Sequence, residues 1–236
     1  MTPENFTSTV IKKEEFGTRF FIITLRLDEP RVLEFLAGQY ISVDVGAGVR
    51  RAYSIASSPK SKEAIELCVD YATQGPGGKF FRDLKVGEIV NFIAPLGFFV
   101  LPEKFESSTK FYFLATSSGI APIKSHLLNL YEKAPNAHAT LYFGTKLKED
   151  ILYKRVFECL EKEHPTFKYV FTISRPADSW RGNTEYIPAL FEKDLNGVEN
   201  SEIFLCGSPL MMQAVLALLK KKKVSDTKIH LEKFST

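Results

Sequence analysis

The stretch KFYFLATSSGIAPIKSHLLNLYEK, residues 110–133, decides the fold of the second half of the chain. Its first seven residues are mostly aromatic or aliphatic, as in a buried strand, and the small residues that follow lead into Pro122 and a helical pattern. The same alternation continues toward the end of the chain. We expect strands at residues 110–116, 139–145, 168–174, 202–208 and 228–234, with helices at residues 121–133, 149–163, 186–193 and 209–223. This order predicts a parallel sheet with right-handed crossovers, in which ligands bind beyond the carboxyl ends of the strands.

The first hundred residues show a different pattern, with short segments rich in β-branched and aromatic residues between Gly, Pro and Asp turns. Such spacing predicts a small antiparallel barrel or sandwich. The expected strands are residues 8–16, 19–28, 39–45, 51–57, 64–71 and 88–95, and a glycine-rich turn with a short helix interrupts them at residues 75–88. At 236 residues the chain is long enough for two domains, which we place at residues 1–104 and 105–236.

Composition and charge narrow the class of protein. Hydrophobic residues make up 44% of the chain and charged residues 25%, which is typical of a soluble globular protein and excludes a disordered or collagen-like one. A formal charge of +3 is too small to indicate a nucleic-acid-binding surface. Cys68, Cys159 and Cys206 lie far apart and form no C-x-x-C pair, which argues against a zinc site, a disulfide framework or an iron–sulfur cluster. We therefore expect no metal site.

The chain has no apolar segment of the length that a signal peptide or a membrane helix needs. We therefore expect no membrane insertion. The expected location is a reducing compartment, either the cytoplasm or, if a transit peptide has been removed, the stroma.

The stretch RRAYSIASSP, residues 50–59, combines chemistry that few strands offer. In an extended strand Arg51 and Tyr53 point to one face, while Ala52 and Ser54 point to the other. A cation, a flat ring and a hydroxyl group therefore lie within a few ångströms of one another. From these residues alone, an edge strand with a solvated arginine remains the alternative.

Loops at three carboxyl ends of the predicted parallel strands are also unusual. The first has small residues around Gly119, which suit the close approach of a diphosphate to a helix N-terminus, but the full G-x-G-x-x-G pattern is absent. No acidic residue ends the second strand convincingly, so an ordinary Rossmann dehydrogenase is disfavoured. CGSP follows the fourth strand, where a buried cysteine before a helix cap is the alternative to a ligand site. The long polar loop after residue 173 is either functional or disordered.

Seven stretches in order and spacing resemble the ferredoxin-NADP(+) reductase superfamily, over about residues 5–235. They are RRAYSIASSP, GPGGKFFRDL, APLGFFVL, ATSSGIAP, FGTKLKEDILY, SRPADSWRGNTEYI and CGSPLMM. The resemblance implies a six-stranded antiparallel barrel that binds FAD, followed by an NAD(P)-binding domain with a parallel sheet.

The resemblance also implies the roles of residues near FAD. Arg51 would pair with the FAD diphosphate, Tyr53 would stack on the isoalloxazine ring, and Ser54 would form a hydrogen bond near flavin N5. The other residues assigned to FAD are Ala52, Gly77, Gly78, Lys79 and Phe81. Phe81 stands where the family usually has Ser or Thr, so one hydrogen bond to phosphate is expected to be missing.

A second group of residues is implied for the pyridine nucleotide. Thr116, Gly119 and Pro122 match the dinucleotide loop, Cys206, Gly207 and Pro209 match the motif beside the nicotinamide, and Glu232 and Phe234 match the C-terminal acid and aromatic residue. Lys146, Ser174, Arg175 and Tyr186 match positions around the 2′-phosphate of NADP, which favours NADPH, with NADH as the alternative. Ser117 replaces the glycine that is commonest in the family. Ser54, Cys206 and Glu232 are the expected catalytic residues.

The expected function is hydride transfer from NAD(P)H to flavin N5, followed by electron release to a ferredoxin, a flavodoxin or a similar acceptor. Many relatives carry an appended [2Fe-2S] domain that we do not expect here, so electrons would leave directly from the flavin. The alternative is an electron-transfer subunit or redox-sensing partner that works only within a larger complex. A structural relative without FAD is disfavoured by RAYS. We expect a monomer.

Overall fold

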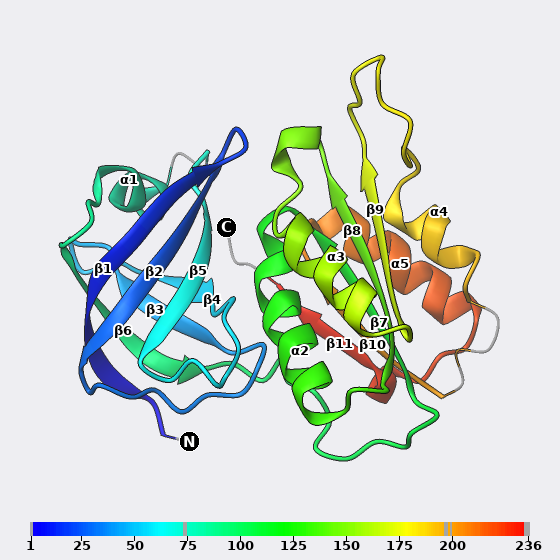
Figure 1. Cartoon of the computed structure of the whole chain (residues 1–236), viewed down its shortest axis with the longest axis horizontal. Coiled ribbons are helices and arrows are strands. Elements are labelled where there is room, and N and C mark those ends of the chain that lie inside the picture. Colours follow the sequence, from blue (N-terminus) through cyan, green and yellow to red (C-terminus); the bar gives the residue numbers. More distant parts are fainter. Residues whose placement is uncertain (1, 73–74, 196–197, 199, 234–236) are drawn as a thin grey trace. The chain divides into compact units, whose positions relative to one another are not determined.

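The computed structural model describes residues 2–72, 75–195, 198 and 200–233, and the chain divides into two compact units (Figure 1). The first unit comprises residues 1–101 with residues 121–129, and the second comprises residues 102–120 with residues 130–236. The domain boundary between residues 104 and 105 stays a prediction. No helix in the described part of the chain is long and apolar enough to cross a membrane.

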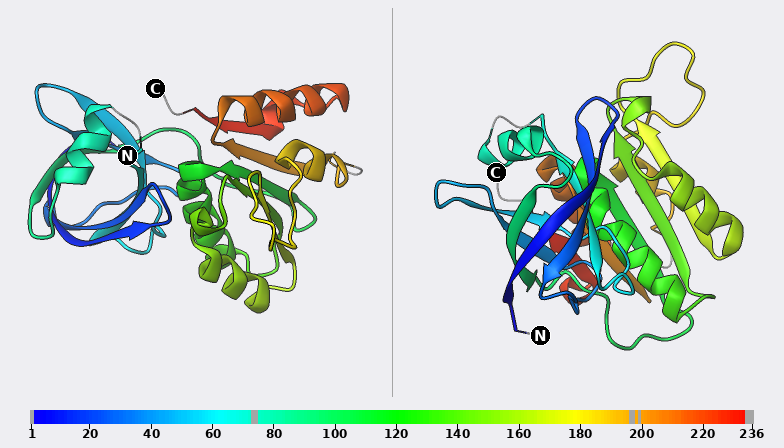
Figure 2. Two further views of the ribbon diagram at one scale, coloured as in Figure 1. Left: turned by 90° about the horizontal axis from the view of Figure 1, so that it is seen from above. Right: turned by 60° about the vertical axis from the view of Figure 1, so that its left-hand side comes forward.

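The first unit contains six antiparallel strands in the order β4-β3-β6-β1-β2-β5. These are β1 (Glu4–Phe16), β2 (Phe20–Glu29), β3 (Tyr40–Asp44), β4 (Arg50–Ser54), β5 (Ala64–Asp70) and β6 (Ile89–Leu96). Ile55, directly after β4, forms an antiparallel bridge with Leu67 of β5, which connects the two edges of the sheet. Figure 2 shows these strands curving around a common interior. The predicted antiparallel barrel is confirmed.

β1 begins four residues earlier than predicted because it serves two neighbours. Its first half pairs with β6, from Glu4 to Thr9, and residues 7–16 pair with β2. Register shifts after Thr7 and Val10 let the strand bend between these partners. Valine, isoleucine, leucine and phenylalanine side chains from every strand of this sheet except β4 fill the interior, and Tyr53 of β4 packs against them.

The helix α1 (Pro76–Asp83) lies between β5 and β6 in the chain, as the glycine-rich stretch predicts. Its fully buried Phe81 joins the barrel core. At its C-terminal end, Lys13 of β1 donates hydrogen bonds from Nζ to the carbonyl oxygens of Arg82, at 2.9 Å, and Leu84, at 2.7 Å. The same ammonium group lies 4.2 Å from the centroid of the Phe21 ring. Burial lowers the pKa of Lys13 against the opposing effect of nearby acidic groups.

The second unit is built on five parallel strands in the order β11-β10-β7-β8-β9. They are β7 (Lys110–Thr116), β8 (His138–Thr145), β9 (Phe167–Ile173), β10 (Ser201–Cys206) and β11 (Ile229–Glu232). Each begins within one residue of its predicted start, so the parallel sheet is confirmed. The predicted end of the last strand, residue 234, lies outside the described residues.

Helices follow four of these strands. They are α2 (Ile120–Lys133), α3 (Lys154–Glu163), α4 (Ile187–Glu192) and α5 (Pro209–Lys221). The packing of α4 and α5 against one face of the sheet forms an apolar core that includes Leu114, Leu205 and Phe191. Figure 1 shows α3 on the opposite face from α4 and α5.

The predicted start of the third helix at residue 149 is wrong. Residues 148–150 form a separate 3-10 turn, and Tyr153 has a left-handed backbone, with φ of 57°, directly before α3. This break turns Ile151 and Leu152 into the core, where they are 5% and 0% exposed. In a continuous α-helix, the neighbouring side chains of Ile151 and Leu152 would project about 100° apart around the helix axis.

The strand order contains one switch point, between β7 and β10. From β7 the chain adds β8 and β9 on one side, and it then returns to add β10 and β11 on the other side. Loops that leave neighbouring strands in opposite directions open a crevice at the carboxyl edge of a parallel sheet. The residues that follow β7 and β10 are therefore expected to form a ligand site.

Lys13→Met is expected to destabilise the first unit by about 1.5–3 kcal/mol, because two carbonyl oxygens lose a charged donor. Urea unfolding followed by circular dichroism measures the change. Lys12→Met is the matched control, because Lys12 pairs with Glu14 at 2.9 Å where both side chains are more than half exposed. Its expected effect is within about 0.5 kcal/mol, and equal losses in the two variants would contradict the role of Lys13.

Candidate functional site

Strand β4 presents three of the predicted flavin residues at different depths. Arg51 is exposed, and its guanidinium donates a hydrogen bond to the carbonyl oxygen of Arg50 at 2.9 Å. Tyr53 is half-buried against the barrel core, and Ser54 is buried. Burial raises the pKa of Tyr53 to about 12, although the charge of Arg51 partly opposes the shift. The phenol group therefore stays neutral at physiological pH.

The start of α1 packs directly against the same strand. A Cβ atom added to Gly77 would overlap the Tyr53 hydroxyl group and would lie 3.4 Å from Cγ of Arg51. Only glycine therefore allows this approach without moving the tyrosine. The ring of Phe81 meets the Tyr53 ring edge-on, with centroids 4.7 Å apart and an interplanar angle of 76°. Two segments that are more than twenty residues apart in the chain thus form one site.

The N-terminus of α1 has the character of an anion site. Gly75 before the helix has no side chain to cap it, and the first turn contains Pro76 but no acidic residue. Free backbone amides and the positive end of the helix dipole favour a phosphate group there, and Arg51 adds a full positive charge close by. The residues present therefore fit the diphosphate of FAD.

Two predicted FAD residues have surroundings that argue for indirect roles. Phe81 is 0% exposed, so its side chain supports Tyr53 from within the core and is not presented to a ligand. Lys79 forms an ion pair with Asp83 at 2.8 Å, and its charge is already matched. Its backbone N–H donates to the Gly75 carbonyl oxygen at 3.1 Å. The remaining two, Ala52 and Gly78, are exposed on β4 and buried in α1 respectively.

In the second unit, the loops after β7 and β10 meet at the switch point. A Cβ atom on Gly119 would lie 2.6 Å from the carbonyl carbon of Cys206 and 2.8 Å from Cα of Gly207. A Cβ atom on Gly207, whose φ is 140°, would lie 2.7 Å from the backbone nitrogen of Thr116. Both positions therefore require glycine. The resemblance assigned these glycines to the approach of a ligand, whereas in the structure the close contact between the two loops is enough to require them.

Thr116 connects the two loops by a hydrogen bond. Its Oγ1 accepts from the backbone N–H of Ser208 at 2.7 Å. Ser208 in turn caps α5, because its hydroxyl oxygen accepts from the N–H of Met211 at 3.2 Å, while Pro209 opens the helix. Pro122 lies in the first turn of α2, which contains no acidic residue. Two helix N-termini therefore begin directly after the switch-point strands.

Ser117 takes a left-handed backbone conformation, with φ of 56°. Residues other than glycine rarely adopt this conformation because their Cβ atom crowds the backbone. Replacing the common family glycine by serine therefore adds backbone strain as well as side-chain volume at this position.

Cys206 and Glu232 lie side by side at the carboxyl ends of β10 and β11, where the strand register pairs them directly. Burial raises the pKa of the Cys206 thiol far above its ordinary value, and the nearby Glu232 charge adds to the effect. Burial also raises the pKa of Glu232. The thiol is fully buried and protonated, which disfavours a role as nucleophile. Phe234, the predicted aromatic partner, lies outside the described residues.

Three residues proposed for the 2′-phosphate are joined by backbone hydrogen bonds beyond β8 and β9. The N–H of Ser174 donates to the Thr145 carbonyl oxygen at 3.0 Å, and the N–H of Arg175 donates to that of Lys146 at 2.9 Å. Lys146, Ser174 and Arg175 are all exposed. The structure thus places the backbone of Arg175 beside that of Lys146, with Ser174 next to them. Tyr186, 73% exposed directly before α4, comes from the far end of the following loop.

The loop between β9 and α4 is folded, with features that the sequence analysis missed. Asn183 forms a parallel bridge with Thr172, and its carbonyl oxygen accepts from the Trp180 indole N–H at 3.2 Å. The indole packs edge-on against Phe171, with centroids 5.8 Å apart. Asn and Gly next to each other in RGNTE are turn residues, and this was the signal available in the sequence.

Within the described residues, no group of three or more His, Cys, Asp or Glu side chains could hold a metal ion. Both candidate sites instead contain glycine, small polar residues and helix N-termini, which would suit phosphate groups.

Comparison with known proteins agrees with this geometry. Residues 7–101 match the family described as oxidoreductase FAD-binding domain, and residues 113–217 match the oxidoreductase NAD-binding domain. The chain is 30% identical to the aromatic O-demethylase, reductase subunit, of an Amycolatopsis strain, covering 98% of this chain and 70% of the relative. It is 29% identical to ferredoxin--NADP reductase B of Sorangium cellulosum, covering 85% of each.

Among solved structures, a cytochrome P450 reductase from Amycolatopsis matches 99% of this chain and 71% of its own, with a TM-score of 0.89 and 28% identity. The chain spans only 51–66% of the length of several other matching relatives. The two matched families occur in the same order along the chain as the two observed folds. The chain belongs to the ferredoxin-NADP(+) reductase-like superfamily of flavin-dependent NAD(P)H oxidoreductases.

Proposed function

We propose that this chain takes electrons from NADPH, with NADH as the alternative donor, and delivers them to a ferredoxin, a flavodoxin or a similar acceptor. The observation that carries the proposal is the site formed by Arg51, Tyr53 and Gly77 at the N-terminus of α1, whose first turn contains no acidic residue. FAD bound there supplies the redox chemistry, since it accepts hydride from a nicotinamide and releases electrons onward. The protein supplies binding, orientation and electrostatics.

Three residues of β4 would hold FAD. Arg51 would bind the diphosphate, because its exposed guanidinium offers several donors of fixed geometry and a permanent charge. Tyr53 would lie against the flavin ring, since its neutral phenol is held by Phe81 on one edge and by Gly77 at its hydroxyl. The Ser54 hydroxyl would form a hydrogen bond near N5.

The residues at the switch point would hold and orient the pyridine nucleotide. The amides at the start of α2, next to Gly119, would bind its diphosphate, and Gly207 would leave room near the nicotinamide. Cys206 and Glu232 would position the nicotinamide without forming a covalent bond to it, because the thiol is protonated and hydride transfer needs no nucleophile.

The preference for NADPH would come from Lys146, Ser174 and Arg175. Their backbone hydrogen bonds fix the two chain segments beside each other, so both cations are available to one phosphate group. A 2′-phosphate carries a negative charge that the ribose hydroxyl of NADH lacks, and charge-assisted hydrogen bonds are the stronger ones.

The names of two relatives support different acceptors. The Sorangium relative is a ferredoxin--NADP reductase, which supports a free-standing reductase with a small redox protein as acceptor. The Amycolatopsis relative is the reductase subunit of an aromatic O-demethylase, which supports the alternative of a subunit within a larger complex. Turnover of the purified chain with ferredoxin or flavodoxin would favour the first, whereas turnover with ferricyanide alone would favour the second.

The wild-type chain is expected to bind FAD and to lose its visible flavin absorbance when NADPH is added without oxygen. Arg51→Ala should weaken FAD binding roughly tenfold to a hundredfold, because a charge-assisted contact contributes about 1.5–3 kcal/mol. Arg50→Ala is the matched control, since the Arg50 guanidinium is held by Ser42, with Nε 3.2 Å from Oγ. A wild-type chain that takes up no FAD would refute the proposed function. Equal affinity in the two variants would refute only the role of Arg51.

Arg175→Ala should lower kcat/KM for NADPH by roughly tenfold or more while leaving that for NADH within about twofold. Steady-state kinetics with both coenzymes measure the ratio. Arg181→Ala makes the same change of charge in the same loop, but the Arg181 guanidinium donates to the carbonyl oxygens of Asp178 and Trp180. A ratio that moves as much in Arg181→Ala as in Arg175→Ala would contradict the assignment.

Glu232→Gln should make the second unit more stable near pH 7. Burial raises the pKa of Glu232 in the folded chain, so folding opposes its ionisation, and stability falls as the pH rises from the unfolded pKa through the folded one. The gain from glutamine should therefore disappear near about pH 3, below the ordinary glutamate pKa, where the wild-type carboxyl group is protonated in both states. Thermal unfolding at the two pH values measures this. The exposed Glu163→Gln is the control, and a gain that does not depend on pH would contradict the argument.

A further inference from the structure

Strand β11 is short and lies at the edge of the parallel sheet. It has four residues, and within the described part of the chain it pairs with β10 alone. A short edge strand with one neighbour is held by few backbone hydrogen bonds. Its last residue is nevertheless Glu232, which the proposed function requires at a defined position. Another interaction must therefore fix the strand.

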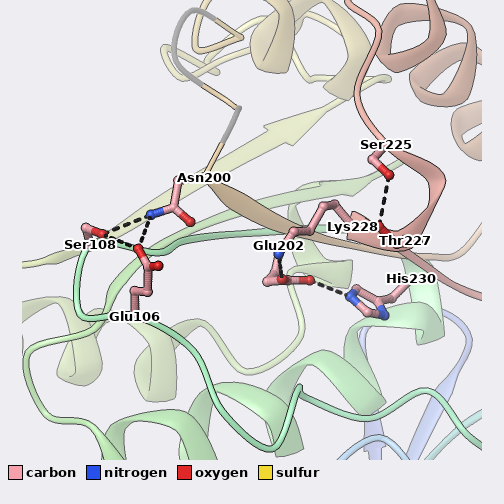
Figure 3. A network of polar contacts seen from close by, with 8 residues as sticks. All are labelled: Glu106, Ser108, Asn200, Glu202, Ser225, Thr227, Lys228 and His230. Atoms are coloured by element: carbon pink, nitrogen blue, oxygen red, sulfur yellow. Dashed lines mark hydrogen bonds and ion pairs between the residues drawn. The ribbon is translucent and has the colours of Figure 1, made fainter.

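A buried carboxylate on β10 provides that interaction. The side chain of Glu202 is only 7% exposed, and both of its oxygen atoms have partners. The Lys228 ammonium group donates to Oε1 at 2.6 Å, and Nε2 of His230 donates to Oε2 at 2.8 Å. Figure 3 shows both partners reaching Glu202 from the segment that leads into and forms β11. We call Glu202, Lys228 and His230 the β11 clamp.

The strand register connects the β11 clamp to the proposed nicotinamide site. His230 pairs with Phe204, and two residues later Glu232 pairs with Cys206. Because side chains alternate along a strand, His230 and Glu232 share one face of the sheet. The His230 ring also stacks on Phe204, with centroids 4.3 Å apart and an interplanar angle of 13°. A shift of β11 by one residue would break these contacts and would turn Glu232 to the opposite face.

We infer that Glu202 and His230 are positioning residues for the proposed reaction, because the β11 clamp sets the register that places Glu232 beside Cys206. This inference rests on the proposed function, which assigns Glu232 and Cys206 to the nicotinamide. The position of Glu232 requires such a clamp because burial of its carboxylate is unfavourable. Glu232 is itself partly buried when it lies beside Cys206, so an unclamped strand end would move its carboxylate toward water.

Two variants of His230 separate the hydrogen bond from the ring stacking. His230→Phe keeps an aromatic ring on Phe204 but leaves a buried carboxylate oxygen without its donor, whereas His230→Gln keeps an N–H donor and loses the ring. Thr227→Val is the control, because Thr227 lies in the same segment and contacts Ser225 through its hydroxyl group at 2.9 Å.

Amide hydrogen exchange on the FAD-free protein tests the clamp without any catalysis. His230→Phe should speed exchange of the β11 amides roughly tenfold or more, with β7 and β8 unchanged, since only the edge strand loses a constraint. His230→Gln and Thr227→Val should resemble wild type. Unchanged β11 protection in His230→Phe would overturn the inference, whatever the activity.

The rate of anaerobic flavin reduction by NADPH tests the positioning. His230→Phe should slow it roughly tenfold at unchanged FAD content, and His230→Gln should restore most of the rate, because a misplacement of about 1 Å can slow a reaction strongly. In a Glu232→Gln background, His230→Phe should have little further effect, since residues that act through one another are not additive. Purely structural damage would multiply the two effects and would overturn the inference.

Failure of the proposed function has a different signature. A wild-type chain whose flavin is reduced by neither NADPH nor NADH would refute the proposed function, while the exchange data would still report on the clamp. Normal reduction in both Glu232→Gln and His230→Phe would refute the positioning role alone, because NAD(P)H-driven reduction would stand.

Discussion

The backbones that leave β7 and β10 approach so closely that no side chain fits between them. Gly119 faces the Cys206 carbonyl group and Gly207 faces the backbone of Thr116, and the Thr116 hydroxyl group accepts a hydrogen bond across the gap. The rest of the second unit follows from this contact. It fixes where α2 and α5 begin, and it sets the two helix N-termini at the one switch point of the sheet.

In the first unit, one glycine and two aromatic rings form a similarly close contact. Gly77 lets the start of α1 rest on Tyr53, and Phe81 one turn later supports the same tyrosine from the core. The exposed Arg51 lies beside this helix N-terminus, and its positive charge would suit an anionic ligand. In both units, therefore, glycine permits close contact within the protein itself.

Buried ionisable groups on β10 and β11 divide into two kinds. Glu202 is matched by Lys228 and His230, so its burial adds order to the strand pair. Glu232 is four residues from Lys228 and is held where burial raises its pKa, which disfavours the charged form. Groups kept at such a cost to stability are common where a site needs them, and this supports the proposed place of Glu232 near the nicotinamide.

By itself, the sequence determined the order and type of the strands and helices, because period-two and helical patterns report directly on which faces are buried. Its motifs also identified the family, and the structure brings Arg51, Tyr53 and Gly77 together as the motifs imply. The break before α3, the left-handed Ser117 and the burial of Phe81 were decided only by tertiary structure. Each depends on what packs beside the residue, as does the β11 clamp, whose members are 26 and 28 residues apart in the chain. Local patterns carry no record of partners at such distances, and only the pairing of β10 with β11 brings those side chains within hydrogen-bond distance of each other.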